Sequence, residues 1–236
     1  MERSKVYLTR EQSRLVDKLA IENGITGISL MENAAKRCVI LLTELKIKSA
    51  LICCGTGNNG GDGFVIARRL AVQGVPVKTI LCGDPDKIEG DALTNYGITQ
   101  SLDVQILQLE DDWSDSELAH RVSVVENQPV DCIVDCLLGT GSVGDPRPPM
   151  DRVINALNGV EARRFAVDVP SGLDCETGVP GKPTFKADMT CTFVAKKTGF
   201  ANEAAKPYLG TVRVGTIGVP DDLVERIITE SSVEDS

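Results

Sequence analysis

Seven short apolar runs recur along the chain from residue 50 onward, and segments with helical periodicity lie between most of them. Apolar runs of this length are typical of buried strands. Strands that are apolar throughout and separated by helices indicate a parallel sheet covered on both faces. The runs predict strands at Ala50–Cys54, Val77–Cys82, Val104–Leu107, Cys132–Cys136, Phe165–Val169, Thr190–Val194 and Thr211–Val214.

Capping signals predict two further helices ahead of the first strand. Thr9 and Gln12 match the capping box, in which each side chain satisfies the free N–H of the other residue. Ser29 and Glu32 match it again. We expect helices near Arg10–Asn23, Leu30–Leu45, Gly63–Gln73, Gly90–Ser101, Asp115–Asn127 and Asp151–Asn158.

The alternation of strands and helices predicts one α/β domain over residues 1–236, with 230–236 as a frayed acidic tail. Ligands of such sheets bind outside the carboxyl ends of the strands. Polar residues directly after a strand are therefore the functional candidates.

The glycine-rich segment after the first strand is the strongest such candidate. Gly55, Gly57 and Gly60 fit the spacing of the dinucleotide fingerprint, and a helix N-terminus that follows them would attract phosphate. Asn58, Asn59 and Asp62 crowd the same turn, which suggests that it also holds an ion or a polar ring. A P-loop is excluded, because no Lys follows the glycines.

Three later segments follow strands in the same way: 135–145, 168–174 and 196–199. Taken singly, each can be read as a turn or a helix cap. Taken together, they are stronger candidates, because a parallel sheet brings all these ends to one edge.

The net charge of -9, from 34 acidic and 25 basic residues, argues against nucleic acid or an anionic membrane surface as the partner. An anionic small molecule remains possible where backbone amides or a bound cation supply local positive potential. We expect the dinucleotide phosphates on the backbone amides of the 58–62 turn or of the 139–145 turn, and not on an arginine cluster, because Arg147 is the basic residue nearest to these turns in the sequence.

The eight cysteines are scattered, mostly inside apolar runs, which favours buried, reduced thiols. The sequence has no C-x-x-C pair, and His120 is its single histidine, so a zinc site, a Cys–His nucleophile and a Ser-His-Asp triad are all disfavoured. It also has no transmembrane-length apolar run and no signal-peptide pattern near Met1. We therefore expect a cytoplasmic protein.

Six groups of residues form one pattern along the chain: Leu30–Ala35, Gly57–Gly63, Asp135 with Gly139–Gly141, Val167–Asp174, Lys197 with Gly199, and Gly210–Val214. Together they resemble the NAD(P)H-hydrate epimerase family, also called the YjeF N-terminal domain, over roughly residues 9–222. The dehydratase domain to which this family is often fused is not expected within these residues. Thr56 and Lys196 depart from the common pattern, because they stand where the family often has proline, and the segment 142–146 is also less typical.

The resemblance implies a Rossmann-like three-layer α/β/α sandwich with a mostly parallel central sheet. It implies an isomerase that interconverts the R and S forms of hydrated NADH or NADPH, coupled to a separate dehydratase, and a homodimer. It implies a potassium ion held by Asn59, Asp135 and Ser171. The residues implied to contact substrate are Asn58, Asn59, Gly60, Gly61, Asp62, Gly139, Thr140, Gly141, Ser142, Val143, Gly144, Asp145 and Asp168.

The chemistry of this substrate needs proton transfer at an oxygen, because the hydroxyl-bearing ring carbon also carries the ring nitrogen. Either water leaves and returns on the other face, or the ring opens and recloses. A carboxylate can transfer the proton, and Asp168 is the predicted catalytic residue. The division of protons among Asp168, Lys197 and water stays open, as does the preference between the two hydrates.

Two alternatives belong to other functional classes. The first is a non-catalytic nucleotide-binding or scaffold module of the same fold, which would be expected to lack the polar site residues. The second is an NAD-dependent dehydrogenase that uses the glycine fingerprint. It would need an acidic residue at the second strand, where Asp84 lies in a Gly-Asp-Pro turn, and also a substrate domain.

Overall fold

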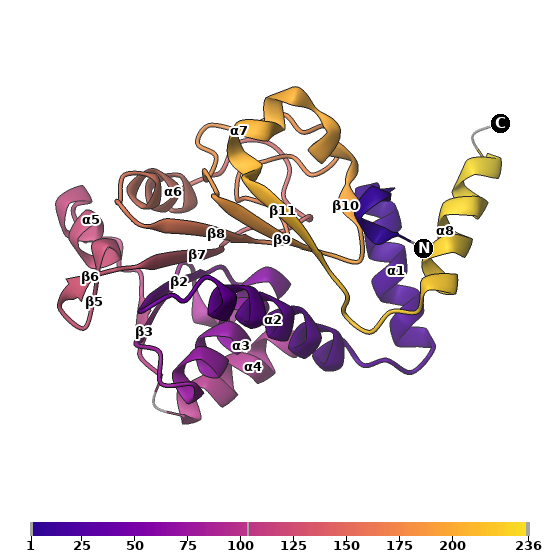
Figure 1. Cartoon of the computed structure of the whole chain (residues 1–236). Helices are drawn as coiled ribbons and strands as arrows, with labels where there is room; N and C mark the ends of the chain where they lie inside the picture. Colours follow the sequence, from indigo (N-terminus) through magenta and orange to yellow (C-terminus); the bar gives the residue numbers. More distant parts are fainter. Residues whose placement is uncertain (1, 103, 235–236) are drawn as a thin grey trace.

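A seven-stranded parallel sheet forms the centre of the computed structural model, which describes residues 2–102 and 104–234 (Figure 1). Its strand order is β11-β9-β8-β7-β2-β3-β4, and every neighbouring pair is parallel. All seven predicted strands are present, with shifts of a few residues. They are β2 (Ala50–Cys54), β3 (Val77–Leu81), β4 (Ile106–Gln108), β7 (Cys132–Cys136), β8 (Arg163–Val167), β9 (Met189–Phe193) and β11 (Thr211–Gly215).

Both faces of the sheet are covered, which confirms the predicted three-layer arrangement. In β2, Ile52 and Cys54 pack into the core beneath α2 (Gly27–Glu44), α3 (Asn58–Val72) and α4 (Gly90–Ser101). Leu51 and Cys53 point the other way, into the core under α5 (Asp115–Ser123) and α6 (Met150–Asn158). Figure 1 shows these two groups of helices on opposite sides of the sheet. Burial on both faces explains why the strands lack polar alternation.

Helix α1 (Arg10–Glu22) begins as predicted, with the Thr9–Gln12 capping box formed in both directions. The second predicted capping box is wrong. Helix α2 begins earlier, because Thr26 is its N-cap and accepts a hydrogen bond from the Ser29 N–H. Glu32 instead forms ion pairs with two arginines of α3, Arg68 and Arg69.

Helix α3 also begins earlier than predicted, at Asn58, so most of the expected glycine loop is its first turn. Gly60 and Gly61 lie in helical backbone and serve close packing. A Cβ on Gly60 would stand 1.9 Å from the carbonyl oxygen of Gly55, and one on Gly61 would stand 2.6 Å from Cε of Met31. Both glycines therefore allow α3 to approach its neighbours closely.

Two differences concern the later helices. Helix α5 is shorter than predicted, because a hairpin of β5 (Val124–Val125) and β6 (Gln128–Pro129) follows it. The hairpin turns through Glu126 and Asn127, which both have positive φ. Helix α8 (Asp221–Glu234) was not predicted, and it extends through most of the segment expected to fray. Residues 235–236 of that segment lie outside the described residues.

A second, two-stranded sheet ties the N-terminal region to the main sheet. Strand β1 (Tyr7–Leu8) pairs in parallel with β10 (Lys196–Lys197), so Leu8 lies opposite Lys197. Helix α1 follows β1 directly and packs against α8. None of the described helices is long and apolar enough to cross a membrane. The remaining short helices are η1 (Arg3–Lys5), η2 (Pro85–Lys87), η3 (Thr198–Ala201), η4 (Glu203–Ala205) and α7 (Lys206–Leu209).

Candidate active site

A cleft of about 580 Å³ opens at the carboxyl ends of the central strands, where ligands of parallel sheets bind. Helix α1 and the start of α2 also contribute to its walls. Many of the predicted substrate-binding residues meet there: Asn58, Asn59, Asp62, Gly139, Thr140, Gly141, Ser142 and Asp168 line the cleft, together with Lys197.

Other predicted positions do not line this cleft. Gly60 and Gly61 pack inside α3, as described above. Val143 is exposed. Asp145 accepts a hydrogen bond from the Lys182 N–H, which joins its loop to a neighbouring loop. Residues 143–145 thus shape the outer part of the turn, and their contact with substrate stays a prediction.

Asp168 directly follows β8 and has a φ of +62°, in the left-handed region. Aspartate tolerates this conformation better than most residues, and such backbone is characteristic of functional sites. Its Oδ1 accepts hydrogen bonds from the Thr192 hydroxyl at 3.1 Å and from the Phe193 N–H at 3.4 Å. These contacts orient the carboxyl group at the edge of the cleft.

Lys197 is the counter-ion of Asp168, at 2.9 Å from Nζ to Oδ1. Lys197 is buried, and its ammonium group also donates to the Phe193 carbonyl at 3.1 Å. A buried ammonium needs such partners, because desolvation of a charge is costly. The pair therefore presents a fixed carboxylate to the cleft.

A second carboxyl group, that of Asp62 on α3, is only 9% exposed, and no described residue donates a hydrogen bond to it. Burial raises its pKa well above the usual range, and the charges of Asp168 and Asp17 add to the shift. Burial thus favours the protonated form of the Asp62 carboxyl group, the form that can donate a hydrogen bond into the cleft.

Asp17 on α1 supplies a third carboxyl group, which the sequence analysis missed. Its side chain is exposed through the open cleft, and it makes no hydrogen bond or ion pair with a described residue. The pKa of Asp17 is raised to about 6, first by burial within the surrounding protein and then by the charge of Asp168, while Lys197 opposes the shift.

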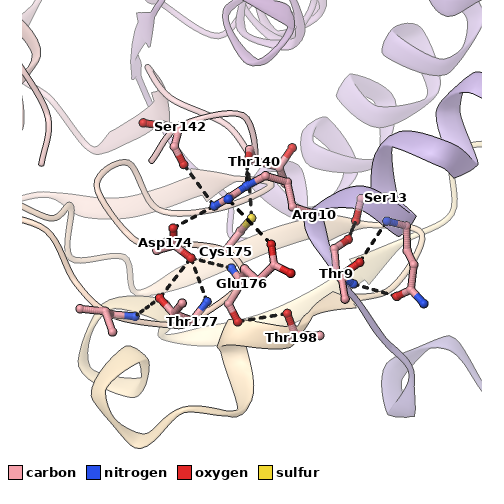
Figure 2. A network of polar contacts seen from close by, with 12 residues as sticks. Thr9, Arg10, Ser13, Thr140, Ser142, Asp174, Cys175, Glu176, Thr177 and Thr198 are labelled. Carbon is pink, nitrogen blue, oxygen red and sulfur yellow. Dashed lines mark hydrogen bonds and ion pairs between the residues drawn. The ribbon is translucent and has the colours of Figure 1, made fainter. Parts of the chain in front are cut away.

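Helix α1 also holds the 139–142 turn in place through Arg10 (Figure 2). Its Nε donates to the Thr140 carbonyl at 2.7 Å, and Nη2 donates to the Asp174 carboxylate at 2.9 Å and the Ser142 carbonyl at 3.4 Å. In Figure 2 the guanidinium group of Arg10 lies between the 139–142 turn and the segment that contains Asp174. Planar charge-assisted contacts of this kind fix geometry well.

Arg14 lies one turn further along α1 and lines the cleft. It is close to the same turn, because a Cβ on Gly141 would stand 3.8 Å from its Nη2. The sequence indicated Arg147 as the nearest basic residue, and the fold places Arg10 and Arg14, which the sequence analysis missed, beside this turn. Helical spacing places Arg10, Arg14 and Asp17 on one face of α1, yet the spacing does not reveal what this face covers.

The three predicted potassium ligands lie at the base of the same region. Asp135 is fully buried and accepts hydrogen bonds from the Ser171 hydroxyl at 2.6 Å and the Ser171 N–H at 2.8 Å. Ser171 Oγ in turn accepts from the Leu138 N–H at 2.9 Å, and Asn59 Nδ2 donates to the Leu138 carbonyl at 3.1 Å. The Leu138 backbone thus links Asn59 to Ser171, and Ser171 links both to Asp135.

Asn59 Oδ1 is buried and has no hydrogen-bond donor in the described structure. A buried amide oxygen without a donor is costly, and a cation would satisfy it. Burial raises the pKa of Asp135 to about 6, although hydrogen bonds from Ser171 and the Leu137 N–H oppose the shift. A cation here would favour the ionised carboxylate, so the residues present fit a weakly charged ion bound by oxygen atoms.

No described group of three or more His, Cys, Asp or Glu residues converges as metal ligands. The eight cysteines are free and buried, as predicted. Asp84, the residue that a dehydrogenase would use for the ribose, caps η2 by accepting from the Asp86 N–H. That contact gives Asp84 a local structural role.

Known proteins match the chain over most of its length. A family model described as YjeF-related protein N-terminus matches residues 27–199. The NAD(P)H-hydrate epimerase of Pirellula staleyi is 41% identical over 96% of this chain and 98% of that protein. The NAD(P)H-hydrate epimerase of Rhodopirellula baltica is 37% identical over 93% of this chain and 87% of that protein.

Two further matches differ in kind. The bifunctional NAD(P)H-hydrate repair enzyme Nnr of Moorella thermoacetica is 36% identical over 93% of this chain, but the match spans 42% of that longer protein. The crystal structure of yeast YNL200c superposes with a TM-score of 0.78 at 21% identity, covering 94% of this chain and 93% of that one, and shows the same fold. The family expected from the motifs is confirmed, and the chain belongs to the YjeF-related N-terminal domain family.

Proposed function

We propose that this protein is an NAD(P)H-hydrate epimerase, an isomerase that interconverts the R and S forms of hydrated NADH or NADPH. One observation carries the proposal: the Asp168 carboxylate stands at the cleft edge, 2.9 Å from the buried ammonium group of Lys197. The names of the full-length relatives support the same activity.

The reaction requires proton transfer at the hydroxyl-bearing carbon of the hydrated ring. This carbon also bears the ring nitrogen, so it can lose water to give an iminium ion, or the ring can open to an aldehyde. Either route needs a positioned group that accepts a proton. Asp168 fits this role, because Lys197, Thr192 and the Phe193 N–H hold its carboxyl group in one orientation.

The phosphates of the substrate fit the first turn of α3 and the 139–142 turn. Gly57 precedes α3 and has no side chain that caps the helix, which leaves N–H groups of the first turn available to an anion. Arg14 adds a positive charge beside Gly141. Phosphate binding would then use backbone amides together with Arg14, whereas the sequence analysis expected backbone amides alone.

Potassium is part of the proposal, with Asn59, Asp135 and Ser171 as its side-chain ligands. The donor-free Asn59 Oδ1 and the buried Asp135 carboxylate support this site. One carboxylate among neutral oxygens carries too little charge for Mg²⁺, which demands close octahedral geometry. When bound, the ion would organise the turns around Leu138 and neutralise Asp135. Melting-temperature titration with KCl against MgCl₂ tests this preference.

An epimerase only interconverts the two hydrates, so repair of the cofactor needs a second enzyme that consumes one of them. We propose that this partner is a separate dehydratase. The fused repair enzymes among the relatives support such coupling. We also propose a homodimer, which light scattering tests, and a reducing, cytoplasmic location, which the eight free thiols favour.

The decisive experiment mixes the purified protein with the R form of hydrated NADH and a dehydratase specific for the S form. Recovery of NADH absorbance faster than spontaneous epimerisation supports the activity. Recovery at the spontaneous rate, with folded protein, would refute it. Direct hydride transfer to or from an alcohol would instead favour a dehydrogenase.

A further inference from the structure

Helix α1 forms a wall of the cleft, and its residue Asp17 makes no polar contact with a described residue that would stabilise the fold. Ser13 and Arg14 line the cleft together with Asp17. The Ser13 hydroxyl donates to the Thr9 carbonyl within the helix, and Arg10 clamps the neighbouring turn. Asp17 has no hydrogen-bond or ion-pair partner among the described residues. The fold therefore does not explain its carboxyl group.

The placement of α1 brings this carboxyl group into the cleft that Asp168 and Lys197 also line. Leu8 of β1 pairs with Lys197 of β10, and α1 starts two residues after Leu8. Asp17 therefore lies about two turns along a helix that begins beside the Asp168–Lys197 pair. The charges of Asp168 and Lys197 both act on it, which places the three groups in one electrostatic environment.

Epimerisation by loss and return of water needs proton transfer on both faces of the ring. In this route the hydroxyl group leaves one face of the ring carbon and water returns to the other face. One group must donate a proton while another accepts one, and enzymes commonly achieve this with carboxyl groups in different environments. Asp168 is paired with an ammonium group, whereas Asp17 is not.

We propose that Asp17 is the second proton-transfer group of this site, an inference that rests on the proposed epimerase function. Asp17 donates its proton to the hydroxyl oxygen from the helix wall of the cleft. The carbon–oxygen bond breaks, its electron pair leaves with water, and the nitrogen lone pair forms the iminium double bond.

Water then attacks the other face of the same carbon. The new carbon–oxygen bond forms, the iminium electron pair returns to nitrogen, and the proton of the attacking water passes to the Asp168 carboxylate on the sheet side. The net result is the inverted hydrate and one proton moved from Asp17 to Asp168. In the reverse direction the two carboxyl groups exchange roles.

The raised pKa of Asp17 agrees with this assignment. The pKa of Asp17 is raised to about 6 by burial and by Asp168, so the acid form persists toward neutral pH. The other charged or titratable groups from facing elements that line the cleft are Asp62, Asp91, Asp168 and Lys197. Arg14 precedes it on α1, and α8, which packs against α1, carries Asp221, Asp222, Glu225 and Arg226 in its first two turns.

The test compares Asp17→Asn with wild type in the coupled assay. Asn keeps the size of the side chain and breaks no hydrogen bond, so we expect an unchanged melting temperature and KM. We expect kcat to fall by about 100-fold or more, as for loss of a positioned acid. Glu11→Gln, which removes an exposed carboxyl group from the same helix, is the matched control and should leave kcat unchanged.

Two further readouts separate proton transfer from a structural effect. Wild-type kcat should decrease as pH rises through the pKa of Asp17, and this decrease should be absent in Asp17→Asn. Epimerisation in water labelled with heavy oxygen should place one labelled oxygen on the inverted product.

Three results would overturn the proposal: an Asp17→Asn kcat within about threefold of wild type, an unaltered pH profile, or retention of the original oxygen. If wild-type protein does not exceed the spontaneous rate, the epimerase function and this inference fail together. If wild type is active and Asp17→Asn matches it, only the role of Asp17 fails.

Discussion

Replacement of Asp168 by Asn separates the chemistry of this carboxylate from its structural pairing with Lys197. Asn tolerates the positive φ of this position, so the backbone should not be strained. Asn Oδ1 can still accept hydrogen bonds from Lys197 and from the Phe193 N–H. What is lost is the negative charge opposite a buried ammonium group.

The magnitude follows from the burial of the pair. The Lys197 side chain is 4% exposed and that of Asp168 is 15% exposed. Removal of one partner from a buried pair costs about 3–5 kcal/mol, because the other charge is left uncompensated. Here the remaining hydrogen bonds and the water in the cleft reduce this cost, so we expect a loss of about 2–4 kcal/mol in the free energy of unfolding.

Activity should fall much further than stability. Loss of a positioned proton acceptor lowers kcat by about 10²–10⁴-fold. Urea denaturation followed by circular dichroism gives the stability, and the coupled NADH-recovery assay gives kcat. The double variant Asp168→Asn, Lys197→Met removes the unpaired charge, so it should regain most of the stability and none of the activity. Near-wild-type turnover in Asp168→Asn would refute the assignment of Asp168, and a double variant less stable than the single one would refute the charge argument.

Three other predictions concern the surroundings of the site. Ser171→Ala removes a donor to Asp135 and an acceptor for a backbone N–H, so it should cost about 2–4 kcal/mol and abolish stabilisation by KCl in thermal denaturation. Arg10→Met releases the turn that this arginine clamps, and steady-state kinetics should show a larger rise in KM than fall in kcat. Although burial opposes it, hydrogen bonds from Arg69 and Arg68 hold the pKa of Glu32 below its ordinary value of 4.5. Glu32 therefore stabilises the fold above that value, so the difference in melting temperature between wild type and Glu32→Gln should shrink as pH falls below it.

The centre of the sheet was predictable because β2 and β7 are buried on both faces, and uninterrupted apolar runs leave little choice of conformation. Ala50–Cys54 and Cys132–Cys136 were predicted to the residue for this reason. Helix starts were less predictable where two capping residues compete. Thr26 and Ser29 both precede apolar helical residues, and the ion pairs of Glu32 with α3 are tertiary contacts that local sequence does not reveal.

The glycine segment lies at the cleft, as the sequence predicts, but Gly60 and Gly61 have a different physical role from the one expected. Its spacing predicts a dinucleotide-binding turn ahead of a helix N-terminus that attracts phosphate. The structure instead places Gly60 against the Gly55 carbonyl and Gly61 against Met31, within a helix that begins at Asn58. A Val at either position would therefore disrupt packing before it tested phosphate binding, which makes these substitutions unsuitable as probes of the substrate.

The groups that sequence reasoning missed all lie on α1, and the reason is topological. Residues that follow strands can be assigned to a site from the sequence, because a parallel sheet brings the carboxyl ends of its strands to one edge. No comparable rule predicts where a helix that precedes the first strand of the sheet will pack. Its position depends on the pairing of Leu8 with Lys197, between segments at opposite ends of the chain. The same contact that secures α1 brings Asp17 into the cleft that Asp168 and Lys197 line. The sheet thus supplies one proton-transfer group, Asp168, and the pairing of β1 with β10 positions the helix that supplies the other, Asp17.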